Sequence, residues 1–311
     1  MKVLVTGGAG FIGHNVVRLL EEQGHTVAIL DNLTNADDAL YSERLDGLNA
    51  KIYQSNIHDV IGRTHVSIFE PEVIIHCASA ANSKAVNADP EGATKSMIIG
   101  LENMLLACKR FKVKRFIFIS SSMVYGNFER PTMVESVPKA PINLYGTLKL
   151  AGERMTKLYA EEHEFEHVII RPSAVYGPRD TRGRVIERFL TQAIANVPLK
   201  VYGEHERLDF TYVDDLALGI TQAIEVDLNI WEPVFNLTRG EERSILRAAM
   251  YIQEGVNSEA RIEIHPADRS MGERGKLDIG RAKKALGYNP TTSLEKGIAK
   301  YYDWIKTTYP V

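Results

Sequence analysis

The sequence predicts an α/β fold built on a doubly wound parallel sheet, followed by a smaller C-terminal α/β domain. Three observations predict it: short apolar runs alternate with amphipathic stretches, glycines mark the first strand-to-helix turn, and this rhythm changes after about Pro172. The chain has 311 residues, 44% hydrophobic and 25% charged. It is therefore long enough for a full core and has the composition of a soluble globular protein.

Six short runs rich in valine and isoleucine have the length of buried strands. They span residues 2–6, 26–30, 51–54, 73–76, 115–120 and 167–171. The longer stretches between them, such as 11–23 and 92–110, have helical spacing. Because crossovers between parallel strands are right-handed, we expect a doubly wound sheet with helices on both faces.

After Pro172, glycines and prolines become frequent and the strand-like segments become shorter. We therefore predict a first domain at residues 1–172 and a second domain formed mainly by residues 173–311. Residues of about 205–235 are expected to return to the first domain. Helical patterns at 214–225 and 293–305 are both expected to cover it.

Charge and cysteine content exclude several classes of function. The net charge of -3 gives no general attraction to nucleic acid or to anionic lipid. Cys77 and Cys108 are too few for a disulfide framework or a set of metal ligands, so we expect no metal and a reducing cytoplasm. No apolar run approaches the roughly 18 residues of a membrane span, so no membrane segment is expected.

The first strand runs into glycines at 7, 10 and 13, which are followed by a helix. Gly7 permits the tight turn, Gly10 lets a diphosphate approach the backbone, and Gly13 lets the helix pack closely. Asp31 ends the next strand, at the distance where an acid binds the adenosine ribose. Its carboxylate would repel a 2'-phosphate, so NAD is preferred over NADP.

Tyr145 and Lys149 are four residues apart in a segment that reads as a helix, at 143–159, so both side chains lie on one face. A lysine ammonium close by helps the tyrosine to ionise. The strand at 115–120 runs into three serines, 120–122, at the edge where doubly wound sheets bind ligands. A serine there can relay a proton to Tyr145.

Seven segments in combination resemble the extended short-chain dehydrogenase/reductase family, in its sugar-nucleotide epimerase and dehydratase branch, which includes UDP-glucose 4-epimerases. These segments are 6–13, 31–33, 120–126, 145–149, 175–179, 209–215 and 286–290. The resemblance implies a Rossmann-like first domain that binds NAD and a second domain that binds a nucleotide sugar, with a UDP-sugar favoured. It also implies a homodimer formed through the helices at 92–110 and 143–159.

The resemblance implies that Tyr145 is the base, that Lys149 binds the nicotinamide ribose, and that Ser121 is the hydroxyl partner. The cofactor contacts that it implies are Gly7, Gly10, Phe11, Ile12, Gly13, Asp31, Asn32, Asn56, Ile57, Ala78, Ser79, Tyr145 and Lys149. The substrate contacts that it implies are Ser121, Ser122, Tyr145, Val201, Tyr202, Arg207 and Arg269.

Two departures from the family pattern concern the sugar and its diphosphate. Family dehydratases have an Asp-Glu pair where this chain has Ser122 and Met123, and a related decarboxylase has Glu in place of Met123. Leu208 stands where the family has a second arginine, with Arg207 one step back. In an extended segment one step reverses the direction of a side chain.

Methionine cannot carry the proton that eliminating water requires, so dehydration is disfavoured, whereas epimerisation needs only the tyrosine, the serine and NAD. We therefore predict NAD-dependent epimerisation at C4 of a nucleotide-diphosphate sugar, with a UDP-hexose favoured. The alternatives are a sugar-nucleotide 4,6-dehydratase or 4-ketoreductase. A non-catalytic NAD-binding sensor is a third, less favoured alternative. The presence of Tyr145, Lys149 and Ser121 together disfavours the sensor, since binding NAD without catalysis does not require this set of residues.

Overall fold

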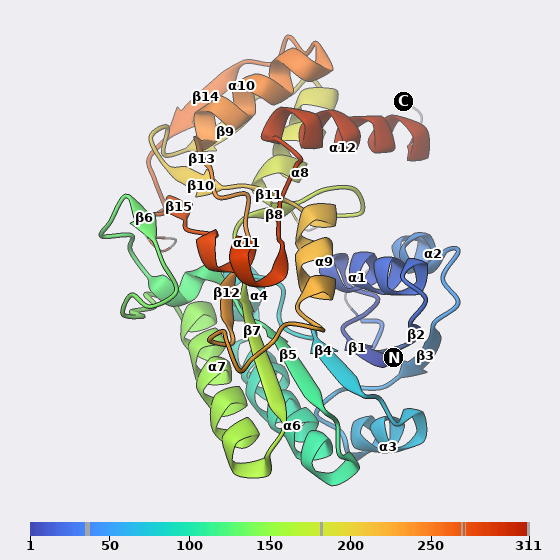
Figure 1. Cartoon of the computed structure of the whole chain (residues 1–311). Helices are drawn as coiled ribbons and strands as arrows, with labels where there is room; N and C mark the ends of the chain where they lie inside the picture. The colour runs from blue at the N-terminus through green and yellow to red at the C-terminus, as the bar shows by residue number, and fades with distance from the viewer. Residues whose placement is uncertain (35–37, 181–182, 269, 271, 310–311) are drawn as a thin grey trace.

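The structure is a computed structural model that describes residues 1–34, 38–180, 183–268, 270 and 272–309. Its centre is a seven-stranded parallel sheet in the order β12-β7-β5-β4-β1-β2-β3 (Figure 1). The strands are β1 (Lys2–Thr6), β2 (Thr26–Asp31), β3 (Lys51–Gln54), β4 (Val73–His76), β5 (Arg115–Ile119), β7 (Glu166–Arg171) and β12 (Val234–Asn236). The strand order reverses between β1 and β4, which confirms the predicted doubly wound topology.

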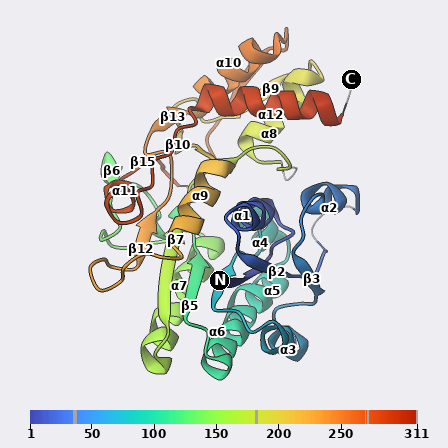
Figure 2. The same cartoon turned by 45° about the vertical axis from the view of Figure 1, so that its right-hand side comes forward.

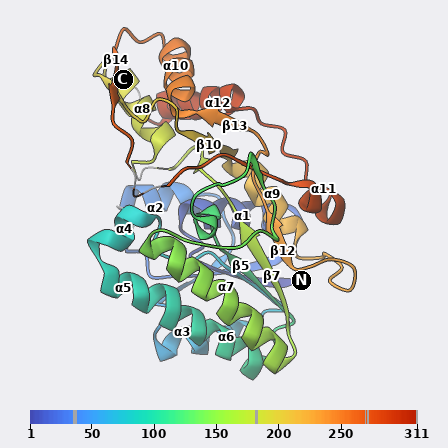
Figure 3. The same cartoon turned by 90° about the vertical axis from the view of Figure 1, so that its left-hand side faces the viewer.

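Helices cover both faces of this sheet because its strands are apolar on both sides. Val3 and Val5 face a cluster formed with α1 (Phe11–Glu22), α9 (Val213–Gln222) and α11 (Gly280–Leu286). Leu4 faces the opposite cluster, formed with α3 (Val60–Phe69), α6 (Gly100–Phe111) and α7 (Leu144–His163). Figure 2 shows α1 beside α9, and Figure 3 shows α6 beside α7.

The predicted helix at 92–110 is built from three consecutive pieces: α5 (Pro90–Thr94), a π-helical turn η1 (Lys95–Ile99) and α6. Asp89 caps its start, because its carboxylate accepts a hydrogen bond from the Gly92 amide at 2.9 Å. Pro90 follows at the first helical position, where its missing N–H costs nothing. Two shorter helices, α2 (Asp38–Leu45) and α4 (Ser83–Ala88), complete this half of the chain.

A separate hydrophobic cluster lies among α8 (Val185–Ile194), α10 (Ile245–Val256) and α12 (Leu294–Thr308), in the part of the chain where a second domain was predicted. Strands in that part of the chain form two pairs: β9 (Leu199–Tyr202) with β14 (Ile262–His265), and β10 (Arg207–Asp209) with β13 (Glu242–Ser244). α12 belongs to this cluster through Leu294, Ile298 and Tyr301. The expectation that residues 293–305 cover the first domain is met at the end of α12, where the Trp304 indole donates to Glu43 of α2 at 2.7 Å, whereas most of the apolar face packs in the cluster with α8 and α10. Periodicity identifies an apolar helix face but not what it packs against.

The chain crosses between the two halves several times. After β8 (Val175–Tyr176), which pairs with β11 (Thr211–Tyr212), helix α9 packs on α1 and β12 extends the large sheet beside β7. β6 (Thr132–Met133) pairs with β15 (Lys276–Leu277). A short 3₁₀-helix, η2 (Ser122–Tyr125), follows β5. These crossings bring the end of β5 close to the loop that precedes β15.

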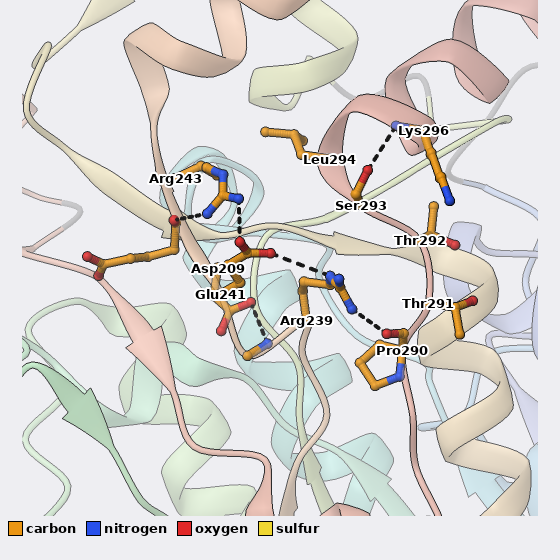
Figure 4. A network of polar contacts seen from close by, with 12 residues as sticks. Asp209, Arg239, Glu241, Arg243, Pro290, Thr291, Thr292, Ser293, Leu294 and Lys296 are labelled. Atoms are coloured by element: carbon orange, nitrogen blue, oxygen red, sulfur yellow. Dashed lines mark hydrogen bonds and ion pairs between the residues drawn. The ribbon is translucent and has the colours of Figure 1, made fainter.

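A polar network ties β10 to the loop that follows β12. The buried carboxylate of Asp209 accepts hydrogen bonds from the Thr238 hydroxyl at 2.9 Å and the Gly240 amide at 3.1 Å. Burial raises the pKa of Asp209 to about 7. Nearby, Glu241 pairs with Arg239 and Arg243, and the Arg239 guanidinium donates to the Pro290 carbonyl (Figure 4). The network fixes the β10–β13 pair against the rest of the chain.

None of the helices in the described part of the chain has both the length and the apolar character that crossing a membrane requires.

Candidate active site

A cavity of about 1050 Å³ opens where the carboxyl ends of the parallel strands meet the second domain. Most of the predicted contacts line it, from both halves of the chain. They are Gly7, Gly10, Phe11, Ile12, Gly13, Asp31, Asn32, Asn56, Ile57, Ala78, Ser79, Ser121, Ser122, Tyr145, Lys149 and Tyr202. One space therefore joins the glycine turn to the tyrosine, the lysine and the serines.

The glycine turn leaves room for a diphosphate. Gly7 has φ +67°, and a Cβ there would lie 2.6 Å from the Ala78 nitrogen. A Cβ at Gly13 would lie 2.1 Å from the Gly7 oxygen, so only glycine lets α1 pack this closely. A Cβ at Gly10 would meet only the Gly7 carbonyl, at 3.0 Å, and otherwise point into open space. Among the residues that the structure describes, no side chain caps α1, so its first N–H groups are left for an anion such as the diphosphate of NAD.

Asp31 braces the turn as well as facing the cavity. Its carboxylate oxygens accept hydrogen bonds from the Ala9 amide at 3.1 Å and the Leu33 amide at 2.9 Å. Next to it, the Asn32 side chain donates to the Asn56 side-chain oxygen at 2.9 Å. The carboxylate and the two amides form a polar rim where the adenosine half of NAD is expected, and these residues fit that group.

Helix α7 carries both Tyr145 and Lys149 into the cavity wall. The Asn143 side chain caps its start by accepting from the Gly146 amide at 2.9 Å. The Lys149 ammonium donates to the Ile119 carbonyl at 2.7 Å, which ties α7 to the end of β5. It lies 5.9 Å from the centre of the Tyr145 ring. Burial lowers the pKa of Lys149 to about 8, against the opposing effect of Cys77 and Glu153.

Opposing effects act on the Tyr145 hydroxyl. Burial raises its pKa, whereas the charge of Arg184, a hydrogen bond with Ser121 and the charge of Arg274 lower it, and the net shift is upward. Ser121 caps η2, and its oxygen accepts from the Met123 amide at 3.1 Å. That bond leaves the serine proton available for donation. Tyrosine and serine can therefore share a proton with a bound hydroxyl group.

A buried ion pair between Arg171 and Glu153 stabilises the position of the serines and of α7. The Arg171 guanidinium, at the end of β7, donates to both Glu153 oxygens, at 2.6 and 2.8 Å. Glu153, one helical turn after Lys149, also accepts from the Ser120 hydroxyl at 2.6 Å. The pair thereby connects β7, α7 and the serine segment.

Two predicted substrate contacts lie elsewhere. Val201 is fully buried in the core of the second domain, because the alternation of β9 turns Tyr202 and not Val201 toward the cavity. Arg207 lies outside the cavity for the same reason: its side chain is 54% exposed and pairs with Glu242, while Leu208 faces the cavity. Arg269 lies outside the described residues.

Three arginines that sequence reasoning missed line the cavity: Arg184, Arg188 and Arg274. Arg184 and Arg188 are four residues apart at the start of α8, a spacing that puts both on one face and could have identified them. Arg274 comes from the loop before β15, and no local pattern indicated it. Its pKa is lowered to about 10 by burial, so it stays charged at neutral pH.

The comparisons with known proteins agree with this geometry. The model of the NAD dependent epimerase/dehydratase family matches residues 3–237. A putative UDP-glucose 4-epimerase of Methanocaldococcus jannaschii is 30% identical over 98% of this chain and 98% of its own length. A UDP-glucuronic acid decarboxylase of Arabidopsis thaliana is 31% identical over 96% of this chain and 66% of its own length.

This chain is similar to solved structures over nearly its whole length. A UDP-glucose 4-epimerase from Thermotoga maritima, solved with UDP-glucose, has a TM-score of 0.92 at 29% identity, covering 99% of both chains. A UDP-glucuronic acid 4-epimerase from Bacillus cereus, solved with UDP-glucuronic acid and NAD, has a TM-score of 0.92 at 29% identity, covering 99% of this chain and 100% of its own.

Proposed function

The chain belongs to the NAD dependent epimerase/dehydratase family, and we propose that it is an NAD-dependent 4-epimerase of a nucleotide-diphosphate sugar, acting on a UDP-hexose. The observation that carries the proposal is the shared cavity of Tyr145, Lys149 and Ser121 with the glycine turn. The 4-epimerases among the relatives and solved structures support the choice of reaction, as does Met123, which has no proton to give in an elimination.

NAD, when bound, supplies a two-electron oxidation at C4 and the matching reduction. The protein's own residues manage the proton. Tyr145 accepts the proton of the sugar 4-hydroxyl at its phenolic oxygen and later returns it, with Ser121 holding the sugar oxygen beside it. Lys149 keeps positive charge near the tyrosine and thereby favours its ionised form. The 4-keto sugar turns over before the second half of the reaction, so both faces of C4 are used.

A substrate panel tests the proposed reaction. Purified protein is incubated with UDP-, dTDP- and GDP-sugars, and the products are separated by chromatography. We expect a UDP-sugar to be converted to a mixture with its C4 epimer, without net consumption of NAD. Release of reduced cofactor in step with product would instead identify a ketoreductase. A 4-keto-6-deoxy product would identify a 4,6-dehydratase, and either result would contradict the proposed epimerase.

We also propose that Arg188 supplies the cation for the substrate diphosphate that Leu208 does not. Its guanidinium lies 5.6 Å from the centre of the Tyr202 ring and forms no hydrogen bond or ion pair with the described residues. Its Nε atom is buried without a partner. Burial lowers the pKa of Arg188, yet an arginine remains charged at neutral pH. A phosphate oxygen would give this charge a partner.

Arg188→Met is expected to raise KM for the nucleotide sugar by about 10-fold or more, because one charge-assisted contact is lost. Arg207→Met is the comparison, since Arg207 lies outside the cavity and pairs with Glu242. Steady-state kinetics of both variants decide between the two arginines. A raised KM for Arg207→Met alone would return the diphosphate contact to Arg207.

We propose a homodimer formed through α5–α6 and α7, located in the cytoplasm. Two apolar side chains on these helices support the dimer, because Leu158 on α7 is 62% exposed and Ile99, just before α6, is 48% exposed. Cys77 and Cys108 form no disulfide, as is usual in a reducing compartment.

A further inference from the structure

Arg274 reaches the reacting end of the cavity from the loop before β15. Its guanidinium donates to the hydroxyls of Ser122 and, at 3.3 Å, Ser173, while another of its nitrogens points at the sulfur of Met123. Ser122 directly follows Ser121, and the positive charge of Arg274 acts on Tyr145. Arg274 therefore lies beside the atoms that are proposed to handle the sugar.

The charge of Arg274 has no matching anion among the described residues. No carboxylate of the described chain lies within ion-pair distance of it, and its Nε atom is buried without a hydrogen-bond partner. Asp209 is the acidic residue whose charge reaches Arg274, but its oxygens are occupied by Thr238, Gly240 and Leu277. A sulfur atom and two neutral hydroxyls compensate only part of the charge of this half-buried guanidinium.

A more deeply buried arginine of this region shows the contrast, because Arg171 is 3% exposed whereas Arg274 is only half-buried. Arg171 has both of its faces satisfied, by two Glu153 oxygens and by the Tyr125 hydroxyl. Arg274 has the same kind of charge without the carboxylate. Because a ligand that fills the cavity would shield this half-buried charge from water, a carboxylate on that ligand would supply the missing partner.

We propose that the sugar taken by this site carries a carboxylate, so that the substrate class is a UDP-hexuronic acid. Arg274 binds the carboxylate, and the hydroxyls of Ser122 and Ser173 turn their protons toward it. A guanidinium is well suited to this contact, because its paired N–H groups match the two carboxylate oxygens. A neutral hexose would offer only a 6-hydroxyl and would leave the charge unpaired. This inference rests on the proposed C4 epimerisation of a nucleotide sugar, and it replaces the neutral hexose of that proposal by the corresponding C6 acid.

Binding and turnover test the inference separately. Calorimetry measures the affinity of the NAD-loaded protein for UDP-glucuronic acid and for UDP-glucose, which differ only at C6. We expect binding of UDP-glucuronic acid to be tighter by roughly 100-fold, because a site built for an anion rejects the neutral analogue. Equal or tighter binding of UDP-glucose would overturn the inference, and epimerisation of UDP-glucose alone would do so while leaving the proposed function intact.

Variants of Arg274 assign the preference to this side chain. In Arg274→Gln the ratio of the two affinities is expected to fall below about tenfold, and Arg274→Lys is expected to recover part of it because it keeps the charge. Arg110→Gln, at the exposed end of α6, is the matched control and should keep the full ratio. Bound NAD and thermal midpoints verify that each variant is folded. An equal loss for both ligands would mean that Arg274 contacts their common UDP part, which overturns the assignment.

The products separate the inference from the proposed reaction. Conversion of UDP-glucuronic acid to its C4 epimer supports both. Release of carbon dioxide with a UDP-pentose supports the carboxylate site but contradicts the epimerase. Tight, Arg274-dependent binding without any product supports the carboxylate site and likewise removes the proposed reaction.

Discussion

Replacement of Tyr145 by phenylalanine is expected to lower kcat for epimerisation by about 1,000-fold or more, while the purified protein keeps its NAD. The reason is chemical, because phenylalanine fills the same space but has no oxygen to accept the proton of the sugar 4-hydroxyl. The glycine turn and Asp31 are untouched by the change, so the cofactor should remain bound. Turnover is measured by product chromatography, and NAD is quantified after denaturation of the protein.

Tyr159→Phe provides the matched control on the same helix. Tyr159 lies three to four turns further along α7, where its hydroxyl donates to Glu102 at 2.9 Å. Removing that partly exposed bond should cost little stability and leave kcat within about twofold of the parent. Turnover of Tyr145→Phe at the parent rate would remove the tyrosine from the mechanism. Loss of NAD from that variant would instead make its inactivity structural.

Arg171→Met is expected to lower the free energy of unfolding by about 3–5 kcal/mol. The change removes the ion-pair partner of the buried Glu153 carboxylate and leaves the Ser120 hydroxyl as its hydrogen-bond donor within the described residues. Urea titration measures the effect. Because Glu153 connects α7 to the serine segment, activity should fall as well under conditions where the variant remains folded.

Two further variants isolate the cause of this loss. Lys157→Met breaks the surface pair between Lys157 and Glu161, whose atoms are 3.7 Å apart and whose side chains are both more than half exposed. It should change the free energy of unfolding by less than about 0.5 kcal/mol. Adding Glu153→Leu to Arg171→Met should restore much of the stability, because no unpaired charge remains. A small effect of Arg171→Met alone would show that water compensates the carboxylate.

Local patterns predicted the strands of the large sheet well. The six predicted strands agree with β1, β2, β3, β4, β5 and β7 to within one residue at each end, because short valine- and isoleucine-rich runs between helices have few other uses. The glycines of the first turn could also be predicted, because their roles are local. Gly7 and Gly13 are needed for close backbone approaches, and for Gly13 that approach is to Gly7 itself, a few residues earlier in the chain.

Predictions that needed a packing partner were less reliable. The α12 pattern was helical as expected, but its apolar face covers the second domain. Val201 and Arg207 were assigned from motif position, and the alternation of β9 and β10 turns both side chains away from the cavity. The face to which a strand residue points its side chain depends on the register of the strand. For β9 and β10 that register is decided by pairing with β14 and β13.

The sequence by itself determined the doubly wound sheet, the glycine turn after β1 and the Tyr145–Lys149 pair on one helix, since each depends on residues close together in the chain. Only the tertiary structure decided which charges meet at the reacting end of the cavity. Arg274 and Ser122 are far apart in the sequence, yet they are hydrogen-bonded. The crossing of the chain between its two halves creates that contact. The energy of a partly buried charge depends on the groups that surround it in space, which the sequence does not show.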